Sequence, residues 1–152
     1  MAYVTNEARQ DLLDGIADAI EEIGAALGAL GGAYELLDER TADRLEEELF
    51  RPIQVAYGRA RRTHTAFAER YGLPTRTFDP AQPGAPSHGV RGFLDMAVDS
   101  VASADDTLAE LQDSMLPVEV GDPELRAGLA DVREHVGELR QRTRELVRTL
   151  GR

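Results

Sequence analysis

Large apolar residues recur at alternating steps of three and four along the N-terminal stretch of the chain. From residue 13 to residue 37 they are Leu13, Ile16, Ile20, Ile23, Leu27, Leu30, Tyr34 and Leu37. An average step of about 3.5 residues places all of them on one side of an α-helix that packs lengthwise against other helices. Thr5 or Asn6 is suited to cap the start of this helix, which we expect over about residues 5–38.

The same alternating spacing of apolar residues recurs in two later stretches of the chain and, less regularly, in a third. It predicts helices over about residues 87–116 and 122–150, where the apolar steps are again of three and four residues. The helix expected over about residues 41–71 has a drifting pattern and contains Pro52, which removes a backbone hydrogen bond. We therefore expect a kink near this proline.

Residues 72–87 carry four prolines and show no periodicity, so they predict a long Pro-rich loop between the second and third helices. Phe78 is placed to pin this loop to the helices. Four helices joined by two short turns and one longer loop predict an all-α, antiparallel up-down-up-down four-helix bundle. We expect it to form a single domain spanning residues 1–152, with the first and third helices diagonal to each other.

Composition narrows the classes of function. The chain of 152 residues has no cysteine, which excludes disulfides, zinc–thiolate sites and thiol nucleophiles. Its net charge of -11 argues against a nucleic-acid partner, which needs a positive surface. The sequence has neither an apolar run of about 20 residues nor a signal-peptide layout at its start, so it predicts a soluble cytoplasmic protein without a membrane partner.

The charges are unevenly distributed. All 17 basic residues are arginines, and residues 5–39 carry nine acids against one of them. Residues 87–116 carry six acids and one arginine, whereas the other two helices have one more arginine than acids. With the acidic helices on a diagonal, each would lie between arginine-bearing neighbours, a pattern that disfavours wrong pairings.

Four glycines lie inside the first predicted helix: Gly24, Gly28, Gly31 and Gly32. Each costs about 1 kcal/mol relative to alanine in a helix interior, so they need a structural reason. Close approach by a neighbouring helix is one explanation. A hollow for a ligand or a flat face for a protein partner, including a homodimer, is the alternative.

Several side chains are candidates for a small-ligand site. Counting along the first two helices places Pro52 level with Gly24 and Gly28, which together with Tyr57 and His64 could form a pocket for an apolar or anionic ligand. The alternative is that this level is filled and that His64 is a buried histidine at the edge of the core. Arg59, Arg62 and Arg70 share one face of the second helix, and they either bind an anionic ligand or partner or pair with acids of neighbouring helices.

A metal site is a weaker candidate. Asp131, His135 and Glu138 follow one another at i, i+4 and i+7, and their donor atoms suit zinc or nickel. The alternative is an exposed flank in which Glu138 pairs with Arg142. The Glu-x-x-His pairs of a di-iron bundle are absent from the sequence, and we expect no cofactor.

The sequence contains no phosphate-binding loop, nucleophile elbow or dinucleotide fingerprint. A non-catalytic protein that acts in protein–protein interaction or oligomerisation through the glycine-rich face is therefore the first hypothesis. A bundle that binds a small apolar or anionic ligand is the alternative, and a metal-dependent bundle is less favoured. The architecture alone does not decide among them.

Overall fold

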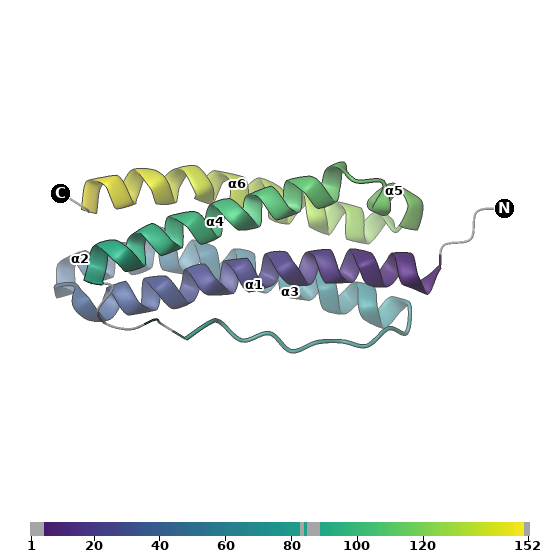
Figure 1. Ribbon diagram of the computed structural model, residues 1–152, viewed down its shortest axis with the longest axis horizontal. Helices are drawn as coiled ribbons and strands as arrows, with labels where there is room; N and C mark the ends of the chain where they lie inside the picture. The colour runs from purple at the N-terminus through teal and green to yellow at the C-terminus, as the bar shows by residue number, and fades with distance from the viewer. Residues whose placement is uncertain (1–4, 83, 85–88, 151–152) are drawn as a thin grey trace.

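The computed structural model describes residues 5–82, 84 and 89–150 and contains only helices and loops within them (Figure 1). The elements are α1 (Asn6–Leu36), α2 (Glu39–Leu45), the π-helical turn η1 (Glu46–Phe50), α3 (Arg51–Arg70), α4 (Gly89–Asp113), α5 (Leu116–Val120) and α6 (Pro123–Leu150). Four long helical rods pack with antiparallel neighbours, and a Pro-rich loop separates the second from the third. The all-α four-helix class is thus confirmed.

The order in which the chain traverses the bundle differs from the expected one. Along α1, Gly32 meets Phe93 and Gly15 meets Leu111, so α1 and α4 are antiparallel. The end of α3 meets the start of α6, so this pair is antiparallel as well. The helices α1 and α6 therefore run one way and α3 and α4 the other (Figure 1), which makes the path up-down-down-up.

The long loop explains this difference. In Figure 1 the loop that follows α3 runs back along the whole bundle, so α4 begins beside the end of α1. A helix of 20 residues, the length of α3, spans about 30 Å, and the loop of residues 71–88 can reach about 60 Å when extended. The loop is long enough to cross over, whereas an up-down-up-down path needs only a short turn.

The expected diagonal placement of the two acidic helices is wrong, because α1 packs directly along α4. Their interface is apolar, and the acids lie at its rims. Exposed charges are worth little individually, while burial of apolar area contributes about 25 cal/mol per Å². Packing therefore decides which helices are neighbours, and ion pairs such as Arg140 with Asp105, at 2.9 Å, follow from it.

The start of α1 and the distortion near Pro52 are explained by residues close to them in the sequence. The backbone N–H of Ala8 donates to Thr5 Oγ1 at 3.1 Å, so Thr5 caps α1. Near Pro52, where a kink was expected, the helix is distorted into η1, a π-helical turn that ends two residues before the proline. A proline ring crowds the carbonyl four residues earlier, here that of Glu48, and a widened turn relieves that crowding.

The connection between the last two long helices contains a helix that the sequence did not predict. The third helix, expected to run to about residue 116, ends as α4 at Asp113, and Pro117 lies in the first turn of α5. Asp122 then caps α6, accepting from the Leu125 N–H at 2.8 Å and from Arg70 at 2.6 Å. Burial raises the pKa of Asp122, but these hydrogen bonds outweigh it and hold the pKa below the ordinary 3.8.

The apolar core is centred on α1. The predicted apolar positions of α1 from Leu13 to Leu30 are buried, and Leu12, Ala19 and Ala26 on the adjoining face are buried too. Tyr34, expected in the core, is 42% exposed because it lies near the end of the bundle. None of the helices in the described ranges combines the length and the apolar character that crossing a membrane requires.

Candidate functional site

The loop of residues 71–88 forms a crossover between α3 and α4. Residues 76–81 of this crossover, which we call the strap, lie across α1 and α3. The buried Phe78 ring meets the His64 ring edge-on, with 5.1 Å between centroids. The Ala81 N–H donates to the Gly24 carbonyl at 3.3 Å, and Arg61 donates to the Phe78 carbonyl at 3.5 Å. The expectation that Phe78 pins the loop is therefore confirmed.

The strap lies over two of the four glycines. A Cβ added to Gly24 would lie 3.4 Å from the Tyr57 ring and 3.5 Å from Pro80, and one added to Gly28 would overlap the Ala81 carbonyl. Close approach therefore explains Gly28, where the neighbour is a loop rather than a helix, whereas a Cβ at Gly24 would make only ordinary contacts with α3 and the strap.

The remaining two glycines differ from each other. A Cβ at Gly32 would lie 2.8 Å from the Phe93 ring, so this glycine lets α4 approach α1. At Gly31, no atom of the described residues lies within 4 Å of such a Cβ. The glycine-rich face is therefore open only at Gly31.

Two buried polar atoms lie in the layer that the strap covers. The Tyr57 hydroxyl and His64 Nδ1 have no hydrogen-bond partner among the described residues. Burial raises the pKa of Tyr57, and burial together with the nearby Arg76 lowers the pKa of His64 below 6.5. An unpaired buried polar group costs about 1–3 kcal/mol, so this layer is not an optimised core.

A groove of about 490 Å³ runs between α3 and the strap. It is lined by Gly58, Arg61, Arg62, Thr65, Ala66, Glu69, Arg76, Thr77 and Phe78. We call it the arginine groove, because three guanidinium groups face one carboxylate there. In a chain with a net charge of -11, such a local excess of positive charge is a candidate binding site for an anion.

The three arginines are engaged to different extents. The guanidinium of Arg61 lies over the Tyr57 ring at 4.8 Å, and Arg61 forms no ion pair with a described carboxylate. Arg76 pairs with Glu21 of α1. Arg62 is exposed and has no ion-pair partner within the described ranges, so its charge is available to a ligand.

The other two arginines proposed from the sequence are committed elsewhere. Arg59 pairs with Asp131 at 3.3 Å, and Arg70 with Asp122 at 2.6 Å. Asp131 lies in the N-terminal half of α6, and Asp122 directly precedes this helix. The helix α6 flanks α3 on the side away from the strap. The shared face of Arg59, Arg62 and Arg70 is therefore divided between an interhelical contact and the groove.

The proposed metal ligands are likewise dispersed. Asp131 binds Arg59, and His135 Nε2 lies 3.2 Å from the Pro52 carbonyl, which links α6 to α3. Glu138 is exposed and forms no ion pair with Arg142. Across the described ranges, no group of three histidine or acidic side chains is placed to hold a metal ion.

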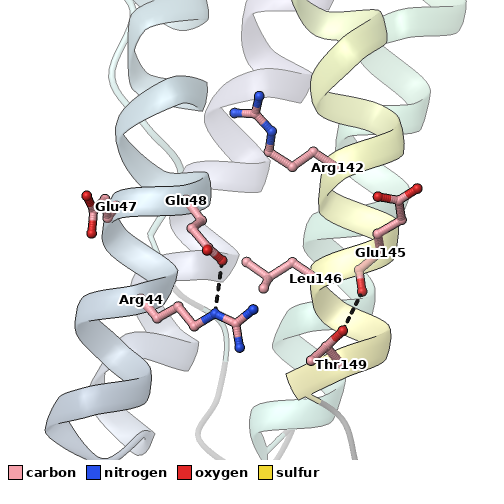
Figure 2. A pocket seen from close by; sticks show the side chains of 7 residues that line it. All are labelled: Arg44, Glu47, Glu48, Arg142, Glu145, Leu146 and Thr149. Carbon is pink, nitrogen blue, oxygen red and sulfur yellow. Dashed lines mark hydrogen bonds and ion pairs between the residues drawn. The ribbon is translucent and has the colours of Figure 1, made fainter.

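A second pocket, of about 540 Å³, lies between the α2–η1 segment and α6 (Figure 2). Its lining residues are Arg44, Glu47, Glu48, Arg142, Glu145, Leu146 and Thr149. Arg44 is bound to Glu48 at 3.1 Å, and Glu47 points away from α6 in Figure 2. With two arginines and three glutamates, this pocket has no excess of positive charge.

Sequence reasoning placed Tyr57, His64 and Arg62 near the site but missed the contributions of Arg61 and Arg76. Arg76 comes from a loop whose path the sequence did not predict, and its position two residues before Phe78 was the available signal. Comparison of this chain with protein-family models, curated proteins and solved structures finds no match. The site therefore has to be interpreted from its own chemistry.

Proposed function

We propose that this protein binds a small organic anion, a carboxylate or a phosphate, in the arginine groove. The observation that carries the proposal is the excess of guanidinium groups in the groove of a protein of net charge -11, where Arg62 forms no ion pair with any described residue. Guanidinium groups bind carboxylates and phosphates through paired, charge-assisted hydrogen bonds.

The rest of the groove suits the organic part of such a ligand. Its volume of about 490 Å³ lies within the range of small-molecule sites. Thr65 and Thr77 offer hydroxyl groups, while Ala66 offers apolar surface. A ligand with one anionic group and a small apolar body would use both kinds of surface.

Isothermal titration calorimetry with benzoate and phenyl phosphate tests this function. Binding should weaken about tenfold or more in Arg62→Gln, and it should weaken as salt screens the charges. Arg59→Gln is the matched control, because Arg59 lies on the same helix but pairs with Asp131. Binding of both compounds by Arg62→Gln as tight as by the unmodified protein would refute the proposal.

Self-association is a second candidate, favoured by one apolar patch. Tyr34 is 42% exposed and borders a cleft of about 340 Å³ with Gly31 and Phe50. This patch contains Gly31, the open part of the glycine-rich face, and a second copy of the chain could bury it. Native mass spectrometry should then show a dimer that Tyr34→Glu converts to a monomer, and a monomer before mutation would exclude this candidate.

A further inference from the structure

We propose that the strap occupies part of the ligand site, and that the ligand is an aromatic carboxylate or phosphate whose ring replaces Phe78 beside His64. This inference rests on the proposed function and specifies the class of the anion. It also assigns the strap a role, since the strap must be displaced before the ring can enter.

The strap is weakly attached for a segment that covers a core. Its two hydrogen bonds to α1 and α3 are long, at 3.3 Å and 3.5 Å, where about 2.9 Å is usual. Phe78 is the strap's one buried side chain, and the rest of residues 76–81 are exposed. The strap is also held by the Arg76–Glu21 ion pair, which is exposed and therefore contributes little. Displacing the strap thus exposes one aromatic ring, breaks two long hydrogen bonds and separates one exposed ion pair.

The layer beneath the strap contains polar atoms to which Phe78 cannot hydrogen-bond. The phenyl ring cannot hydrogen-bond to the Tyr57 hydroxyl or to His64 Nδ1, which both remain unpaired. A ligand ring with a polar substituent could reach such atoms. Gly24 and Gly28 lack the side chains that would otherwise close the space along α1 once the strap has moved.

Arg61 couples anion binding to strap displacement, and Arg62 of α3 also stays in the groove when the strap, with Arg76, moves away. Arg61 lines the arginine groove and also donates to the Phe78 carbonyl, so its guanidinium cannot give all its donors to a ligand while the strap is in place. When Phe78 leaves, that donor becomes free for the anion. The anionic group and the aromatic ring would thus occupy adjacent places, at Arg61 and at His64.

The glycines of α1 provide a test that leaves the ligand-contacting side chains unchanged. In Gly28→Ala the new Cβ overlaps the Ala81 carbonyl and should force the strap outwards, whereas Gly31→Ala adds a methyl group to open space. If the strap competes with the ligand, the apparent affinity is limited by the fraction of molecules with the strap displaced. The dissociation constant for 2-naphthoate, followed by its fluorescence, should then fall about tenfold in Gly28→Ala and stay within about twofold in Gly31→Ala.

The outcomes separate this inference from the proposed function. If Arg62→Gln weakens 2-naphthoate binding but Gly28→Ala binds no more tightly than Gly31→Ala, the strap is not a competitor and only this inference fails. If Arg62→Gln has no effect, or if no variant binds 2-naphthoate, the proposed function fails for this class of ligand and the inference fails with it.

Phe78→Ala gives an independent check. It should also bind 2-naphthoate more tightly, and more tightly than Phe93→Ala, which opens a similar space at the α1–α4 interface away from the strap. Equal gains in the two variants would mean that any cavity binds the ring, which would overturn the inference.

Discussion

Thr143 lies on the core-facing side of α6, in the apolar series that the sequence predicted, and its side chain is fully buried. Its hydroxyl has no hydrogen-bond partner among the described residues, and the same holds for the Tyr57 hydroxyl and His64 Nδ1. Sequence periodicity placed Thr143 in the buried series of α6 but gave no information about a partner for its hydroxyl. The difference in location matters, because Tyr57 and His64 lie under the strap, whereas Thr143 lies in the interior of the bundle.

Replacing Thr143 by valine should stabilise the protein by about 1 kcal/mol, since it removes an unpaired buried hydroxyl at constant size. Urea unfolding measures the difference. Thr107→Val is the control, because the Thr107 hydroxyl donates to Glu22 at 2.6 Å, and its removal should destabilise the protein. Destabilisation by Thr143→Val would mean that its hydroxyl is paired in solution.

His64 should make stability depend on pH in the mildly acidic range. Burial lowers its pKa in the folded state, so below pH 6.5 the unfolded chain binds a proton that the folded protein does not. The unfolding free energy should therefore fall between pH 7 and pH 5.5, and it should fall less in His64→Leu. Denaturant titrations at the two pH values test this, and equal slopes for both proteins would contradict it.

At the scale of single elements, α1 contacts three neighbouring segments of the chain. It packs against α3, against α4 and under the strap, and each contact uses a small residue: Gly24 faces Tyr57, Gly32 faces Phe93 and Gly28 faces Ala81. The sequence indicated that these glycines needed a reason. It could not say which neighbour each one meets, because a glycine leaves the same space for a helix, a loop or a ligand.

Alanine substitutions at adjacent positions of α1 should have opposite effects. Gly31→Ala should stabilise the protein by about 1 kcal/mol, the usual gain for replacing an unhindered helix glycine. Gly32→Ala should destabilise it, because the new Cβ would lie 2.8 Å from the packed Phe93 ring. Thermal unfolding of the two variants measures these changes in stability. A change of the same sign in both variants would show that α1 and α4 do not pack as described.

At the scale of the whole molecule, the crossover joins two helical hairpins that share one apolar core. The first hairpin contributes α1 and α3, the second α4 and α6, and α1 packs along α4 while α3 packs along α6. Cutting the crossover should therefore leave the two halves associated. Arg76 is an exposed cleavage site for trypsin within it, whereas most other arginines lie in helices.

Brief trypsin treatment should cleave first after Arg76 and leave a folded, associated pair of fragments. Gel filtration and circular dichroism should give the values of the intact protein, while a denaturing gel shows two halves. Arg76→Gln should resist this first cleavage. Separation of the fragments in the absence of denaturant would mean that the contacts between the hairpins do not hold the bundle together.

Spacing along the chain determined the four long helices, the buried positions from Leu13 to Leu30 and the cap at Thr5, because these depend on residues within one or two helical turns. The tertiary structure decided the direction of α4, the strap over Gly24 and Gly28, and the pairing of Arg59 with Asp131. These features depend on where the crossover carries the chain and on which apolar surfaces then meet. Periodicity does not encode that path, so Arg61, Arg62 and Arg76 come together only in the folded molecule.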